Sequence, residues 1–313
     1  MNSLVEHSTQ QGINLNVAQF NLYEEEFHPS PLMHIWLEFK RSHFALIGFA
    51  ILLLFCAIAI LAPLLAPYDP NVQNTNAILL PPAWEGNGSI AHIFGTDTLG
   101  RDVFSRTLYG CQVTFGSSIF LVLIAATIGV ALGTLAGMKK GIKSSVLNHL
   151  LDSLMAIPTL LVAIIIVAIL GTGLWNSMWA IILVLIPQFV HQTRTFVREE
   201  MKKDYILLDK LDGASSPRIF WSSILPGMFE LLVVQSTLAL SVAIIDISAL
   251  GFLNLGAQSP VVELGASLSQ SLEVAYTAPW LVALPGLCIF LMVLSINIVG
   301  EGLRTALRNR LIH

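Results

Sequence analysis

The run FALIGFAILLLFCAIAILAPLLA, from Phe44 to Ala66, contains 23 residues and no charged side chain. A helix of about 20 apolar residues crosses the hydrocarbon core of a bilayer, so this run predicts a membrane-spanning helix. Of the 313 residues in the chain, 55 % are hydrophobic and only 12 % are charged, whereas soluble domains have about 25 % charged residues. The composition excludes a single soluble domain and also a disordered chain, which would be poor in apolar residues.

Five further apolar runs, together with residues 44–66, predict an all-α membrane protein with six transmembrane helices. They cover residues 115–138, 154–174, 177–190, 231–253 and 280–299. Cytoplasmic loops are rich in Lys and Arg, and fourteen of the 16 basic residues fall on one side of this arrangement. Only Arg101 and Arg106 fall on the other side. We therefore expect the N-terminal segment 1–43 and the C-terminal tail 302–313 to be cytoplasmic.

Several kinds of chemistry find no support in the sequence. The formal net charge of −4 argues against a nucleic-acid-binding protein. The three cysteines, Cys56, Cys111 and Cys288, are scattered and odd in number, so they predict no disulfide framework. The eight histidines lack metal-ligand spacing, and the Gx4GK[ST], HExxH and GxSxG motifs do not occur. We expect a protein that is not an enzyme and that carries no metal or cofactor of its own.

The segment 67–111 is expected on the outer side, and its last part resembles a short amphipathic helix. In FGTDTLGRDVFSRTLYG (Phe94–Gly110), Asp97 precedes Arg101 and Asp102 precedes Arg106, each by four residues. Opposite charges at this spacing meet on one face of a helix. Two interpretations are open: a surface helix that only braces the bundle, and an element with a direct role in transport.

The segment 204–226 on the expected cytoplasmic side has the pattern helix, tight turn, helix. Gly213 follows a Leu-rich stretch and suits the left-handed position that ends a helix. Ser216 followed by Pro217 is a helix-start signal. This is either an ordinary pair of interfacial helices or, as we favour, a surface on which a partner docks through the leucines.

Two patterns within the spans concern packing and function. Gly129, Gly133 and Gly137 form a GxxxGxxxG stripe, which lets another helix approach closely; a flexible hinge is the alternative. Asp246 is an acid inside a span, where charged groups are costly. It is interpreted either as a proton or cation site or as a structural acid bonded to a neighbouring helix.

Four motifs in order resemble the inner-membrane permease subunits of bacterial dipeptide and oligopeptide ATP-binding-cassette (ABC) importers. The resemblance covers nearly everything from Leu32 onward, and LNHLLDSLMAIPTLLVAIIIVA (Leu147–Ala168) is most similar to the C-subunit branch of the Sap system. The four motifs are the Phe94–Gly110 segment, Gly213-Ala214-Ser215 ahead of Leu225-Pro226, IIDISALGFLNLGAQSP (Ile244–Pro260) and NIVGEGLRTAL (Asn297–Leu307).

The resemblance implies a type I ABC transporter transmembrane domain over residues 112–301, with the first span outside it. It also implies three kinds of protein partner besides membrane lipid, and no nucleic acid. These partners are a homologous second permease, two cytoplasmic ATP-binding subunits that use the ATP, and a periplasmic solute-binding protein.

The family's docking element carries a Glu-Ala-Ala triplet, and this sequence departs from it with Leu207-Leu208-Asp209. The resemblance still implies an ATPase-coupling segment at this place and a translocation pathway or gate near the end of the fifth span. The coupling residues are Leu207, Leu208, Asp209, Leu211, Asp212, Gly213, Ala214, Arg218 and Pro226, and the pathway residues are Asp246, Gly251 and Gly256.

The leading functional hypothesis is the pore-forming permease of an ABC transporter in the bacterial inner membrane, which moves peptides, antimicrobial peptides among them. Two alternatives stay open. One is an ion-coupled secondary transporter that uses Asp246. The other is an ABC permease for small cations such as polyamines.

Overall fold

The computed structural model describes residues 31–138, 151 and 153–310, and these residues form helices and no β-strand. Five helices are long and apolar enough to cross a membrane, which confirms the predicted all-α membrane fold. These helices are α2 (His43–Leu65), α3 (Val103–Met138), α6 (Leu174–Glu200), α9 (Leu225–Phe252) and α11 (Trp280–Arg310).

The run expected as the third span, residues 154–174, contains the shorter helix α5 (Thr159–Leu170) of 12 residues. Twelve residues rise about 18 Å, well short of the roughly 30 Å hydrocarbon core. Pro158 precedes the helix and Gly171 follows it with a φ of +92°, so residues that cannot continue an α-helix bound it on both sides. The six-helix prediction is thus met by five full-length helices and one short one.

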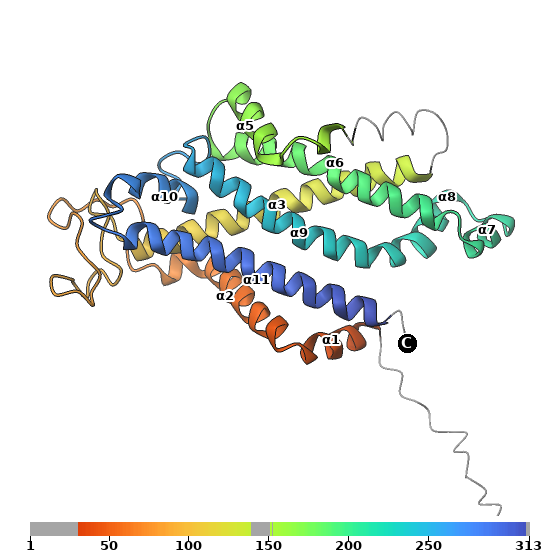
Figure 1. Ribbon diagram of the computed structural model, residues 1–313, viewed down its shortest axis with the longest axis horizontal. Helices are drawn as coiled ribbons and strands as arrows, with labels where there is room; N and C mark the ends of the chain where they lie inside the picture. The colour runs from red at the N-terminus through yellow and green to blue at the C-terminus, as the bar shows by residue number, and fades with distance from the viewer. Residues whose placement is uncertain (1–30, 139–150, 152, 311–313) are drawn as a thin grey trace, which may run out of the picture.

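The long helices run side by side, and the connecting elements gather at two opposite ends of the bundle (Figure 1). One end, here called the loop end, carries residues 66–102 and α10 (Leu264–Ser271). The opposite end, here called the α7 end, carries α7 (Asp204–Leu211), α8 (Ser216–Ile219) and the C-terminal part of α11. The amphipathic helix α1 (Pro31–Arg41) packs against α11.

Helix α8 continues into α9 through a π-helical stretch, η1 (Phe220–Ile224), in which the Leu225 N–H donates to the Phe220 carbonyl five residues earlier. The apolar helix therefore extends from Ser216 to Phe252, over 37 residues. At 1.5 Å per residue this is a rod of about 55 Å. It joins the α7 end of the bundle to the loop end.

Helices α3 and α6 pack closely along the three glycines of the GxxxGxxxG stripe. A Cβ atom added at Gly133 would lie 2.7 Å from Thr193 Cβ, and one added at Gly137 would lie 2.8 Å from Val197 Cβ. At Gly129 the distance to Phe189 Cβ would be 2.3 Å. The glycines therefore serve as the contact surface between two helix backbones.

The helix expected over residues 94–110 begins only at Val103, where it forms the first turns of α3. Residues 95–102 instead form tight turns, and Gly95 and Gly100 have φ values of +74° and +72°. A Cβ at Gly100 would come within 2.0 Å of the Asn74 carbonyl oxygen, so the turn lies directly against the preceding loop. The helix expected to lead into the second span is therefore present only from Val103 on, because Gly95 and Gly100 place the preceding residues in turns.

Candidate functional site

The turn between α7 and α8 has the geometry of a Schellman motif. The Ala214 N–H donates to the Asp209 carbonyl at 2.9 Å, and the Gly213 N–H donates to the Lys210 carbonyl at 3.1 Å. Gly213 has a φ of +79°, a conformation in which only glycine avoids strain. Ser215, one residue earlier than expected, is the N-cap of α8, and Pro217 lies within its first turn.

One side of α7 is anchored in a small apolar core at the α7 end. Ile206 is fully buried there against Val197, Ile219, Ile224 and Met228. Because these residues come from α6, α8, η1 and α9, the core fixes α7 to four neighbouring elements.

Polar contacts add to this anchoring. The Ser223 hydroxyl donates to the Asp209 carboxylate at 2.8 Å, and Lys203 pairs with Glu200 at 2.8 Å. The Tyr205 hydroxyl donates to Glu200. Partial burial, together with this hydrogen bond, raises the pKa of Tyr205 to about 12. The hydrogen bond from Ser223 thus joins Asp209 in α7 to η1 and stabilises the turn between α7 and α8.

The other side of α7 has exposed leucines. Leu207, Leu208 and Leu211 are 56 %, 61 % and 75 % exposed, and their spacing of three and four residues places them on one face. Asp212, Gly213 and the more distant Arg218 and Pro226 are also exposed. None of the described residues covers this apolar face. The opposite side of α7 packs against the apolar core around Ile206.

Asp246 lies on α9 and is buried, with 5 % of its surface exposed. Its side chain lies beside Thr159, the first residue of α5. The N-terminus of a helix favours a negative charge, so α5 offsets part of the cost of burying this acid. The arrangement is that of an acid that joins two helices within the bundle.

Gly251 and Gly256 lie at the loop end, where the backbone packs against Glu263. A Cβ at Gly251 would come within 2.1 Å of Glu263 Oε2, and one at Gly256 would lie 2.8 Å from the Gly251 Cα. These two glycines therefore permit close packing around a buried acid.

Sequence reasoning missed Glu263, which is fully buried at the N-cap of α10. Its carboxylate accepts hydrogen bonds from the Gly265 N–H at 2.9 Å, the Ala266 N–H at 2.8 Å and the Thr114 hydroxyl at 2.9 Å. Burial raises the pKa of the Glu263 carboxyl group, and these hydrogen bonds act in the opposite direction. Glutamate is not a preferred N-cap residue, so the sequence carried no signal for it.

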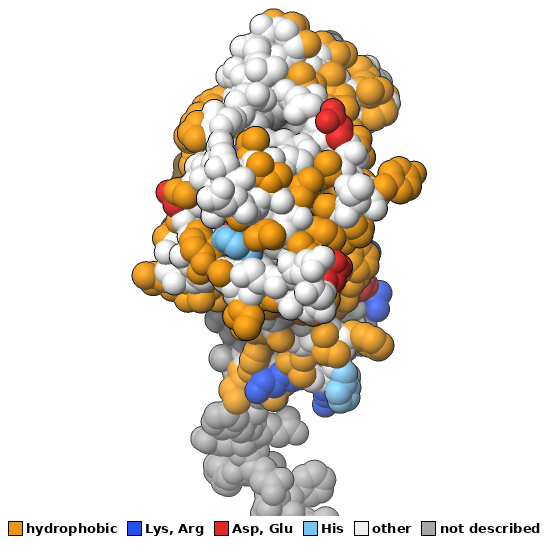
Figure 2. Space-filling view, turned by 90° about the vertical axis from the view of Figure 1, so that its left-hand side faces the viewer, with side chains coloured by type: hydrophobic (Ala, Val, Ile, Leu, Met, Phe, Trp, Pro, Cys, Tyr) orange, Lys and Arg blue, Asp and Glu red, His pale blue; other side chains and the backbone are white. Residues whose placement is uncertain are grey.

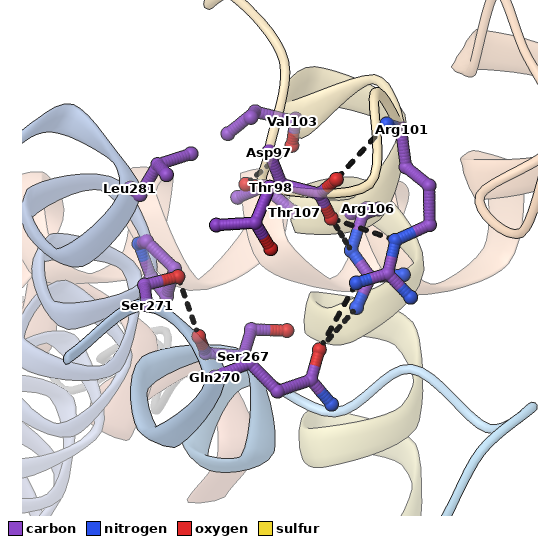
Figure 3. Close-up of a pocket in the computed structure, with 11 residues that line it drawn as sticks. Asp97, Thr98, Arg101, Val103, Arg106, Thr107, Ser267, Gln270, Ser271 and Leu281 are labelled. Atoms are coloured by element: carbon purple, nitrogen blue, oxygen red, sulfur yellow. Dashed lines mark hydrogen bonds and ion pairs between the residues drawn. The ribbon is translucent and has the colours of Figure 1, made fainter. Parts of the chain in front are cut away.

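The four charged residues of the Phe94–Gly110 motif form two separate contacts, of which Figure 3 shows the one around Asp97. Asp97 Oδ2 accepts from Arg101 Nε at 2.7 Å and lies 3.5 Å from Arg106 Nε. Asp102, expected to pair with Arg106, instead contacts His92 at 2.9 Å and accepts from the Ser105 N–H at 2.8 Å. Because Asp102 precedes the first turn of α3, its carboxylate caps that turn. Arg106 therefore pairs with Asp97 and not with Asp102.

Comparison with known proteins decides the family. The profile described as "Binding-protein-dependent transport system inner membrane component" matches residues 129–313, more than half of the chain. This chain belongs to that family. A second profile, the N-terminal TM domain of oligopeptide transport permease C, matches residues 30–82.

Individual relatives of this permease resemble it over nearly their whole length. The dipeptide transport system permease protein DppC of Haemophilus influenzae is 41 % identical over 90 % of this chain and 96 % of its own length. The peptide transport system permease protein SapC of an Escherichia coli strain is 44 % identical over 92 % of this chain and 97 % of its own. Both branches match at similar identity. The permease described here is a multi-pass protein of the inner membrane.

Proposed function

We propose that this chain is the pore-forming permease subunit of an ABC transporter that moves peptides across the bacterial inner membrane. The observation that carries the proposal is the α7 surface. It is an exposed leucine face on a helix whose opposite side packs against the apolar core around Ile206. The names of the relatives, which are dipeptide and peptide transport permeases, support peptides as the substrate class. Residues 112–301 form the type I transmembrane domain in this proposal.

The partners follow from the same surface and from the family. ATP-binding subunits dock on Leu207, Leu208 and Leu211 at the α7 end, where an amphipathic helix fits an apolar groove. A homologous second permease completes the pathway, and a solute-binding protein delivers the substrate at the loop end. This chain binds no ATP itself in the proposal, since it has no phosphate-binding Gx4GK[ST] motif.

The orientation is proposed from the basic residues and from the positions of the elements. Both α7 and the C-terminal part of α11 lie at one end of the bundle (Figure 1), and fourteen of 16 basic residues belong to segments assigned to that side. The α7 end is therefore cytoplasmic by the positive-inside rule, and the loop end is periplasmic.

The mechanism of coupling is a rigid-body movement that α9 transmits. The chain from Ser216 to Phe252 is helical throughout, so a displacement of α7 and α8 by an ATPase is passed along about 55 Å of helix. Closure of the ATPase pair then moves one permease half against the other and opens the pathway to alternate sides.

The proposal is tested by purification of the tagged chain from membranes in mild detergent, followed by identification of the proteins that come with it. We expect a second permease and ATP-binding subunits with the unmodified chain. Leu211→Glu places a charge on the leucine face and should remove the ATP-binding subunits while the second permease is retained.

Ile90→Glu is the matched control, because Ile90 is 89 % exposed and lies in the segment at the loop end. This variant should retain every partner. Recovery of the ATP-binding subunits in equal amount from the Leu211→Glu variant contradicts docking at this face. Recovery of the unmodified chain alone, under conditions that preserve related complexes, contradicts the permease proposal.

A further inference from the structure

Two arginines share one carboxylate in the cluster at the loop end. Arg101 and Arg106 both approach Asp97 Oδ2, with Nε distances of 2.7 and 3.5 Å. Their residues are only 9 % and 7 % exposed. Asp102, the next acid in the chain, is engaged by His92 and the Ser105 N–H. The two guanidinium groups therefore carry one positive charge more than the carboxylate between them balances.

The hydrogen-bonding capacity of the two arginines also exceeds what the protein uses. A guanidinium group has five N–H bonds, and among the described residues the pair donates four hydrogen bonds. One goes to Asp97, one to the Pro70 carbonyl and two to Gln270 Oε1, each of the latter at 3.2 Å. Gln270 is a neutral acceptor, so it shares donors but contributes no negative charge.

These groups border a small pocket with a volume of about 20 Å³. Its remaining lining includes hydroxyl groups from the turn before α3, from α3 and from α10, as Figure 3 shows: Thr98, Thr107, Ser267 and Ser271. On the face that Figure 2 shows, the visible Lys and Arg side chains lie only in the lower part.

We propose that this pocket binds a carboxylate group at the loop end of the permease. A single guanidinium group can bind a carboxylate through two parallel hydrogen bonds, and Asp97 engages the two arginines through one oxygen only. The inference deepens the proposed function and rests on it for the ligand. The carboxylate belongs either to the C-terminus of a transported peptide or to an acidic side chain of the protein that delivers it.

The test is equilibrium binding of tritiated peptides to the purified full chain in lipid nanodiscs, which needs no ATP-binding subunit. Three probes are compared: N-acetyl-trialanine, its C-terminal amide, and N-acetyl-Ala-Glu-Ala-amide. The two peptides with a carboxylate should bind at least tenfold more tightly than the amide without one. Preference for the first identifies a peptide C-terminus as the ligand, and preference for the third identifies an acidic side chain.

Two substitutions separate binding from structural support. Arg106→Gln should weaken carboxylate binding at least tenfold, whereas Arg308→Gln, the same change on an exposed residue of α11, should leave it unchanged. Asp97→Asn removes the competing carboxylate but keeps Oδ1, which accepts from the Leu99 and Arg101 N–H groups. It should therefore tighten carboxylate binding severalfold, while a purely structural cluster predicts the opposite.

Equal binding of all three probes overturns the inference, and so does a loss of binding in Asp97→Asn that matches the loss in Arg106→Gln. These results are independent of the purification experiment on ATP-binding subunits. A failed carboxylate site with intact ATPase docking leaves the permease proposal standing. A failed docking experiment leaves the binding measurement interpretable.

Discussion

Gly213→Val is the perturbation that most directly tests the turn between α7 and α8. Gly213 has a φ of +79°, and a Cβ added there would meet nothing within 4 Å. The substitution therefore has no steric clash within the chain, and its cost comes from the backbone alone. An L-residue in the left-handed region costs about 1–2 kcal/mol, which changes the ratio of formed to unformed turn by a factor of about 5 to 30.

The assay is the initial rate of uptake of a labelled peptide by vesicles that contain the whole complex, normalised to the amount of this chain. We expect Gly213→Val to lose uptake by up to the same factor of about 5 to 30, with the protein still inserted. Gly213→Asn adds a side chain of similar size, but asparagine tolerates the left-handed conformation. It should therefore transport at close to the normal rate.

Normal uptake by Gly213→Val would refute the argument that this turn couples the ATP-binding subunits to the pore. An equal loss in the Val and Asn variants would refute the backbone explanation and would indicate a direct contact between position 213 and a partner.

Three further predictions concern packing, charge and pH. Gly133→Val should destabilise the bundle by about 1–3 kcal/mol, because its Cβ would lie 2.7 Å from Thr193 Cβ. Thermal unfolding in detergent measures this loss of stability. The control is Gly116→Val, which should be nearly neutral because nothing lies within 4 Å of the added Cβ. Asp246→Asn keeps the size of the side chain and should retain transport; loss of transport with intact assembly would instead favour an ion-coupled mechanism. The pKa of Tyr205 rises from 10.0 to about 12 on folding, so the folded protein favours the neutral phenol. The contribution of Tyr205 to the stability of the fold is therefore complete below pH 10 and is lost as the pH rises toward 12. Limited proteolysis of α7 should show increased cleavage over that range, and Tyr205→Phe should reduce the pH dependence.

Features that depend on local patterns could be predicted from the sequence. The uncharged run at residues 44–66 becomes α2 almost residue for residue. The position of Gly213 after a Leu-rich stretch anticipates its positive φ. In both cases the physical cause, apolar length or backbone freedom, lies within a few neighbouring residues.

Features that depend on distant residues could not be predicted in this way. Arg106 binds Gln270, which is 164 positions away in the sequence, and the carboxylate of Glu263 bonds Thr114 across 149 positions. The four-residue spacing of Asp102 and Arg106 fits a helix, and α3 does begin at Val103, but the Asp102 carboxylate caps that helix and contacts His92 instead. The pairing of Asp97 with Arg101 follows the predicted four-residue spacing, whereas the approach of Arg106 to Asp97 depends on packing that no local pattern records.

The π-helical stretch η1 places a constraint on chain length. Ile219 and Ile224 both face the core beneath α7 although they are five residues apart, and the five-residue hydrogen bond of the π-helix allows this alignment. Deletion of one residue from Phe220–Ile224 would restore an ordinary α-helix and rotate α7 about the axis of α9 by about 100°. The three leucines of the docking face would all still be present, but they would point in a different direction. This stretch should accept many substitutions but no insertion or deletion.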